Sequence, residues 1–95
     1  MRLDKFLKVS RVIKRRTVAK EVCTGGRVQV NGRVAKAGTE LEVGDFLVIE
    51  LGRRILEIRV LALADSVRAE DAQSLYEVLR VTEKPRDDFF GQENG

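Results

Sequence analysis

The sequence contains no histidine and no tryptophan, and its only cysteine is Cys23. Without histidine the chain cannot build Ser-His or Cys-His nucleophile pairs, and it lacks the commonest general base. A single cysteine cannot form an intramolecular disulfide, and it cannot supply a zinc ligand set without histidine. We therefore interpret Cys23 as a small buried apolar residue. We expect a non-enzymatic protein with no metal site and no cofactor.

Long apolar segments are also missing. No run approaches the roughly 20 residues of a membrane span. The opening Met1-Arg2-Leu3-Asp4-Lys5 places charge where a signal peptide needs an apolar region. No GxGxxG or Walker A loop is present to cradle a nucleotide. These absences predict a soluble, cytoplasmic protein with no membrane partner.

Acidic residues are scarce in the first 36 positions, where eleven lysines and arginines face only Asp4 and Glu21. This half carries +9, and because the whole chain carries +3, the remainder carries −6. Like charges this dense repel one another unless a polyanion neutralises them. The alternative, a basic face that only aids solubility, is less consistent because such surfaces normally mix both signs. The sequence thus predicts a polyanion as the partner of the basic half.

The first segment has helical periodicity. At 100° per residue Leu3, Phe6, Leu7, Ser10 and Ile13 fall on one arc. This spacing predicts an amphipathic helix over residues 3–13. Its lysines and its arginine lie on the other side, away from the predicted core.

A second, shorter helix is expected after a basic elbow, Lys14-Arg15-Arg16, with Thr17 as its N-cap. The pair Gly25-Gly26 ends it, because glycine tolerates the left-handed conformation at that position. The residues that should face inward are Val18, Ala19, Val22 and Cys23. Two short helices are therefore predicted to meet at a cluster of positive charge.

Strand patterns follow the glycines. Residues 27–30 alternate and run into Asn31-Gly32, a strong signal for a two-residue hairpin, with residues 33–34 beyond it. Residues 46–51 and 55–61 are two longer strands joined at Gly52-Arg53. We expect ion pairs on the wet face among Glu50, Arg54, Glu57 and Arg59.

The C-terminal third is predicted to be helical. Ala72, Leu75, Tyr76 and Leu79 have helical spacing, which predicts a third helix over residues 66–81 with an acidic exposed face. Residues 86–95 are expected to be a mobile tail. The expected fold is α+β, with two short helices packed on a small, mainly antiparallel sheet and a C-terminal helix. Residues 1–64 form the predicted binding domain, and residues 65–95 form an acidic helix and tail.

The class of polyanion follows from the scarcity of aromatic residues, which make up 5% of the chain. Phe6 is the only one in the basic half and belongs to the apolar arc. Without aromatic platforms for stacking bases, single-stranded readout is disfavoured. Phosphates of a folded RNA are the favoured ligand. Duplex DNA, read by a helix-turn-helix, is the alternative, although the second helix offers no Asn or Gln to read adenine.

Two further readings stay open. If the acidic exposed face of the third helix is the functional surface, the chain is an adaptor. Glu40, Glu42 and Asp45 form a tight carboxylate cluster, which is interpreted as an ordinary acidic turn and less readily as a Mg²⁺ site.

The order of several motifs resembles the S4 RNA-binding domain family: the opening RLDKFL, the elbow KRRT, the segment GRVQVNG and the turn VGD. The resemblance covers roughly residues 1–60. It is to the free-standing form of this domain, the heat-shock-protein-fifteen type, and within that form to the bacterial ribosome-associated quality-control members.

The resemblance implies two helices on a small sheet with RNA laid across the helices. It implies binding to ribosomal RNA of the large subunit when peptidyl-tRNA is stranded there, beside a partner that adds a tail to the stalled chain. We expect a monomer in which Arg16 is the foremost contact and Asp4 orients a base such as Lys8. The candidate RNA-binding residues are Arg2, Lys5, Lys8, Arg11, Lys14, Arg15, Arg16, Lys20, Asn31, Arg33 and Lys36.

Overall fold

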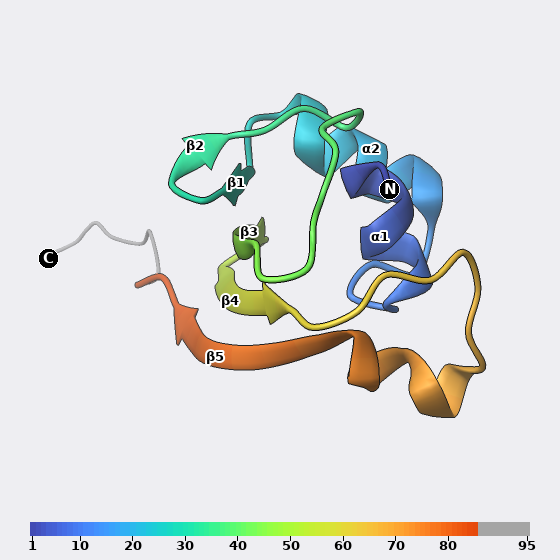
Figure 1. The fold of residues 1–95 in the computed structure, drawn as a ribbon. Helices are drawn as coiled ribbons and strands as arrows, with labels where there is room; N and C mark the ends of the chain where they lie inside the picture. The colour runs from blue at the N-terminus through green and yellow to red at the C-terminus, as the bar shows by residue number, and fades with distance from the viewer. Residues whose placement is uncertain (86–95) are drawn as a thin grey trace, which may run out of the picture.

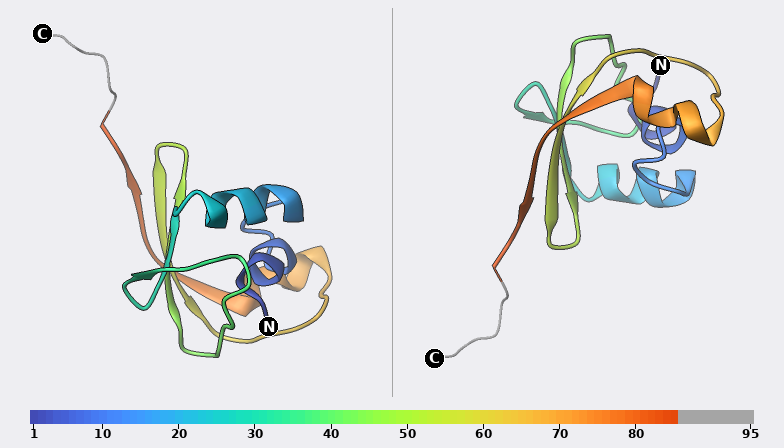
Figure 2. Two further views of the ribbon diagram at one scale, coloured as in Figure 1. Left: turned by 90° about the horizontal axis from the view of Figure 1, so that it is seen from above. Right: turned by 90° about the horizontal axis from the view of Figure 1, so that it is seen from below.

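A computed structural model describes residues 1–85 of the chain, and it shows an α+β fold in two layers (Figures 1 and 2). The elements are α1 (Leu3–Val9), α2 (Arg16–Thr24), β1 (Val28–Val30), β2 (Arg33–Val34), β3 (Phe46–Leu51), β4 (Arg54–Val60), the 3₁₀-helix η1 (Ala69–Leu75) and β5 (Tyr76–Glu83). The strands form one antiparallel sheet in the order β2-β1-β3-β4-β5. Both helices cover one face of it, as Figure 2 shows.

The β1–β2 hairpin turns at Asn31-Gly32, as predicted. Both residues have positive φ, 52° and 86°, which is the combination that a type I′ turn requires. Asn31 also anchors this turn to the next strand. Its amide nitrogen donates to the Asp45 carboxylate (3.0 Å), and its amide oxygen accepts from the backbone N–H of Phe46 (3.0 Å).

The central strands β3 and β4 pair around Gly52, and alternate residues point to opposite faces. Leu47, Ile49 and Ile58 are fully buried on the face that the helices cover. The same core receives Phe6 and Leu7 from α1. Because full burial of each such side chain contributes about 1.5–3 kcal/mol, this contact between the layers is the main stabilising feature of the small domain.

The first helix is shorter than predicted and ends at Val9. Ser10 caps it, and Arg11 adopts a left-handed φ of 64°, so the helix does not continue to residue 13. The chain then folds back, and the Ile13 N–H donates to the carbonyl of Leu7 (3.0 Å). Ile13 is therefore still buried. The apolar period predicted which residues lie in the core but not where the helix stops.

The start of α2 also differs from the prediction. Arg15 occupies the N-cap position with extended backbone, no side chain caps the helix, and Thr17 lies inside the first turn. Ala19, Val22 and Cys23 are buried as expected, whereas Val18 is 39% exposed. The other end is as predicted, because Gly25 caps the helix and Gly26 has a φ of 74°.

The predicted helix over residues 66–81 is wrong. Residues 69–75 form η1, and residues 76–83 form β5, which pairs with β4 along its whole length. An unpaired β4 would leave a row of backbone N–H and C=O groups at the sheet edge, and β5 satisfies them. The β-branched residues Val78, Val81 and Thr82 also favour a strand. The division of the chain at residue 64 stays a prediction, and the predicted tail 86–95 lies outside the described residues.

The expected ion pairs on the wet face of the sheet do not form as predicted. Glu50 pairs with Lys84 (2.7 Å) instead of Arg54, and Arg59 donates to the carbonyl of Gly44 (2.9 Å). Arg54 lies opposite Leu51, on the other face of the sheet from Glu50, so the alternation of side chains separates the two.

Cys23 is buried, as predicted, and 2% exposed. Burial, followed by the negative charge of Asp4, raises the pKa of the Cys23 thiol from its ordinary value of 9.0 to about 11. We expect alkylation by iodoacetamide at pH 8 to be about a hundredfold slower in the native protein than in guanidinium chloride, because the thiolate is the reactive species. Mass spectrometry of timed samples measures both rates. Equal alkylation rates in the native and the denatured protein would contradict the burial of Cys23.

Candidate nucleic-acid interface

The candidate cations are carried mainly by the helical layer. Those at α1, the elbow and α2 have exposed or half-buried side chains. They are Arg2, Lys5, Lys8, Arg11, Lys14, Arg15, Arg16 and Lys20. Lys36 belongs to the connection between β2 and β3, which runs back past α1. Arg33 lies on β2, at the sheet edge away from α1 (Figure 1). The structure thus gathers most of the predicted residues on one layer and leaves Arg33 at its margin.

Asp4 is the centre of this layer, because its buried carboxylate joins two arginines from different elements. The Arg2 guanidinium donates to it through Nε (3.1 Å) and Nη2 (3.3 Å). The Arg16 Nη2 lies 3.5 Å from Asp4 Oδ1. The Asp4 side chain is 2% exposed, whereas those of Arg2 and Arg16 are about half exposed. Each arginine therefore has one anchored side and one side open to solvent.

The ionised form of Asp4 is favoured despite its burial. Burial alone raises the pKa of this carboxyl, but the hydrogen bonds from Arg2 and from the Lys5 backbone N–H (2.8 Å), with the charges of Arg16 and Arg2, lower it overall. The same contact raises the pKa of Arg2. A fixed negative charge is thus maintained between two fixed positive charges.

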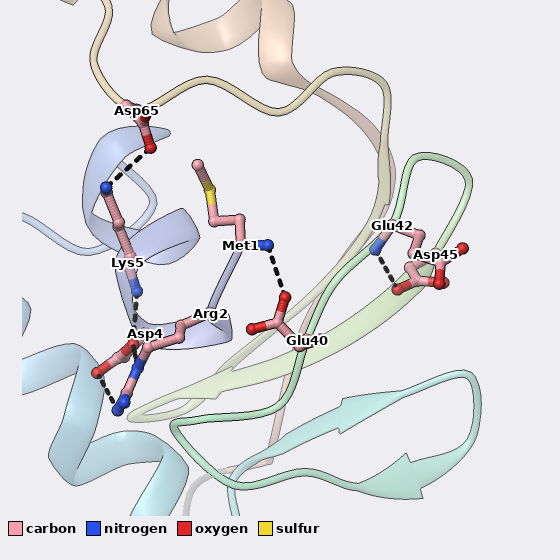
Figure 3. Close-up of polar contacts among 8 residues, drawn as sticks. All are labelled: Met1, Arg2, Asp4, Lys5, Glu40, Glu42, Asp45 and Asp65. Carbon is pink, nitrogen blue, oxygen red and sulfur yellow. Dashed lines mark hydrogen bonds and ion pairs between the residues drawn. The ribbon is translucent and has the colours of Figure 1, made fainter.

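Asp4 orients basic side chains, as expected, but these are Arg2 and Arg16 and not Lys8. It also accepts from the Lys5 backbone N–H. The carboxylate points across to α2 rather than along α1 (Figure 3). One signal in the sequence was available. Asp4 and Glu21 are the only acids in the basic half, and a carboxylate surrounded by many cations indicates a place where cations are held together.

The loop of residues 35–41 fixes the start of α1, which has no side-chain cap. The backbone N–H groups of Leu3 and Asp4 donate to the carbonyls of Thr39 (2.8 Å) and Ala37 (3.1 Å). The N-terminal amine pairs with Glu40 (2.9 Å), as Figure 3 shows. These bonds satisfy N–H groups that a helix start otherwise leaves free. They hold Arg2 in place next to Asp4.

The first turn of α2 is an unusual place for cations. Arg15 and Arg16 lie at its N-cap and first helical positions, and no acidic residue occupies the first turn. Positive charge at the positive end of a helix dipole costs stability, typically about 0.3–1 kcal/mol per charge. Free backbone N–H groups and guanidinium groups at one point are suited to bind a phosphate. This end of α2 is therefore a candidate anion site.

Lys5 is partly neutralised within the protein. Its ammonium pairs with Asp65 (2.9 Å), a residue of the segment that follows β4, and this contact lowers the pKa of Asp65 (Figure 3). Beside the pair, Lys8 and Arg11 line a hollow of about 190 Å³ together with Ser66 and Val67. Lys5, like Arg2 and Arg16, is thus a predicted contact that already pairs with a carboxylate of the protein itself.

The acidic cluster has a structural explanation. Asp45 accepts from the Glu42 backbone N–H (2.9 Å) and from Asn31, and Glu40 pairs with the N-terminus. Within residues 1–85, no group of three acidic, cysteine or histidine side chains is arranged to hold a metal ion. In the same residues no helix is long and apolar enough to cross a bilayer. The cluster serves the turn before β3.

Comparisons with known proteins identify the family and the fold. The family model described as the S4 domain matches residues 1–47. An RQC P-site tRNA stabilizing factor from Halalkalibacterium halodurans is 59% identical over 78 residues, covering 82% of this chain and 89% of its own. A heat shock protein 15 homolog from Haemophilus influenzae is 37% identical over 90 residues, covering 94% of this chain and 69% of its own. The solved structure of heat shock protein 15 from Vibrio cholerae, described as trimeric, superposes with a TM-score of 0.77 at 34% identity. The match covers 82% of this chain and 80% of that one.

Proposed function

This chain belongs to the S4 domain family, and we propose that it is a non-enzymatic RNA-binding protein that acts in quality control of stalled ribosomes. On the large subunit it binds ribosomal RNA and contacts the tRNA that carries the stranded nascent chain. A relative named for stabilising the P-site tRNA, with 59% identity over most of both chains, supports this proposal. The place of action is the cytoplasm.

The observation that carries the proposal is the Asp4 cluster. One buried carboxylate holds Arg2 and Arg16 side by side while leaving both guanidinium groups open to solvent. Guanidinium groups fixed in this way match the geometry of phosphate oxygens and lose little entropy on binding. Around them we place the remaining contacts: Lys5, Lys8, Arg11, Lys14, Arg15 and Lys20, with Asn31, Arg33 and Lys36 at the margin.

A DNA-binding regulator is the second candidate, because α2 is basic and exposed. However, α2 has nine residues and contains no Asn or Gln. A recognition helix reads base edges with several side chains, and the cations here suit phosphates better. An adaptor acting through residues 65–95 is the third. It predicts that deletion of residues 65–95 abolishes function while RNA affinity persists. A tailing factor on the stalled subunit is the expected neighbour in either ribosomal role.

Cosedimentation with separated ribosomal subunits tests the proposal. We expect binding to the large subunit and little binding to the small one, with further retention when peptidyl-tRNA is present. If about five phosphates are contacted, the log–log slope of affinity against salt is about −4. Excess duplex DNA serves as competitor, and sedimentation of the free protein tests the expected monomer. If duplex DNA abolishes binding at a molar excess at which competitor RNA does not, the result would support the DNA-binding regulator instead.

A further inference from the structure

A pocket of about 430 Å³ lies between the C-terminal end of α2 and residues 34–38, which are the end of β2 and the segment that follows it. Three small side chains line it, those of Cys23, Ala35 and Ala37, together with Gly26 and Gly38. The space exists because these residues are small. Its volume falls within the range of about 300–1,000 Å³ that is typical of ligand sites.

The pocket adjoins the Asp4 cluster. A Cβ placed on Gly38 would lie 3.8 Å from the guanidinium carbon of Arg2, so this cation borders the pocket. Along α2, Arg16, Lys20 and Thr24 are four residues apart and share one side of the helix, and Thr24 lines the pocket. Lys36 also lines it. The pocket is therefore continuous with the basic surface and has cations at its border.

We propose that this pocket receives one unpaired base of the bound RNA while Arg2 holds an adjacent phosphate. This inference rests on the proposed function. Sequence-specific recognition of RNA commonly uses bases that are splayed out of loops and bulges. An apolar lining suits the faces of such a base. In the described part of the chain, the backbone N–H groups of Ala37 and Gly38 donate to no protein acceptor, which leaves them available for the polar edge of a base.

An apolar protein side chain is the other occupant that the volume allows. The border of Arg2 and Lys36 favours RNA, because cations around a pocket attract a ligand that carries phosphates. Val34, which lines the pocket, is 65% exposed, so replacing it should alter binding without disturbing the core.

The test uses Gly38→Leu, which adds a side chain at the lining of the pocket, next to Arg2. Gly38 has no left-handed φ, and nothing lies closer than 3.8 Å to the added Cβ, so the backbone tolerates a side chain here and the full chain should fold, which its melting temperature checks. We expect affinity for purified large subunits to fall about five- to tenfold, because the base loses apolar surface contact with the pocket. The slope against salt should become shallower by no more than about one unit, because Arg2 is the only proposed phosphate contact that the new side chain adjoins.

Val34→Asn is the second variant, because filling the pocket also presses on Arg2. Val43→Asn is its matched control, since Val43 is 62% exposed and lies in the turn before β3. We expect Val34→Asn to weaken binding and Val43→Asn to leave it unchanged. Dimethyl sulfate probing should show one unpaired ribosomal base that the wild-type protein protects and that Gly38→Leu leaves reactive.

Two results overturn the proposal without touching the proposed function. One is that Gly38→Leu binds large subunits with wild-type affinity while Arg16→Ala binds them weakly. The other is weaker binding by Gly38→Leu with every base protection retained, which would assign the pocket to a protein side chain. If the wild-type protein does not bind large subunits at all, the proposed function and this inference fail together.

Discussion

Replacing Arg16 by alanine is expected to weaken binding to the large ribosomal subunit by about ten- to a hundredfold, the range of a lost charge-assisted hydrogen bond. The slope of log affinity against log salt should become shallower by about one unit, because one phosphate contact is lost. A filter-binding or cosedimentation titration at several salt concentrations measures both quantities.

The stability of the Arg16→Ala protein should change little. The ion pair to Asp4 is 3.5 Å long, the Arg16 side chain is about half exposed, and Asp4 keeps its hydrogen bonds from Arg2 and the Lys5 N–H, which limits the cost of losing the pair to about 1 kcal/mol. Alanine has high helix propensity, and removing a cation from the start of α2 relieves an unfavourable interaction with the dipole. These gains offset the lost pair. Arg80→Ala, an exposed arginine on β5, is the control that should bind normally. Equal affinity of the two variants would refute the role of Arg16.

Asp4→Asn is expected to separate specific from non-specific RNA binding. The amide keeps the shape of the carboxylate but loses the charge that holds Arg2 and Arg16 together. We expect affinity for the large subunit to fall about tenfold, because the two guanidinium groups lose their common orientation. Affinity for an unrelated RNA duplex should be equal or higher, since the protein becomes more positive. A merely structural role would lower both affinities together.

The pH dependence of stability provides a second readout for Asp4. Its folded pKa lies below the ordinary value of 3.8, so its contribution to stability is fully present above pH 3.8. That contribution is lost as the pH falls from 3.8 through the folded pKa. Urea unfolding between pH 6 and pH 2.5 should show a shallower loss for Asp4→Asn than for the wild-type protein. Parallel curves would show that this carboxylate is not favoured in its ionised form.

Much of the helical layer was predictable from short-range patterns. The apolar period identified Leu3, Phe6, Leu7 and Ile13 as core residues, and all four are buried. Turn chemistry located the Asn31-Gly32 hairpin and the end of α2, because each depends on one or two residues with positive φ. The partners of Asp4 were not predictable, since they come from α2 and from the residues before α1, and only packing brings them together.

The sequence by itself determined the charge asymmetry, the two-helix and hairpin signals, and the exclusion of histidine chemistry, because these depend on residue identity and local spacing. Tertiary structure decided the secondary structure of residues 76–83. Their helical spacing is real, but the open edge of β4 offers backbone partners that an isolated segment cannot have, so they form a strand. It also decided that Arg2 and Arg16 share one carboxylate, because that contact requires α1 and α2 to pack against each other.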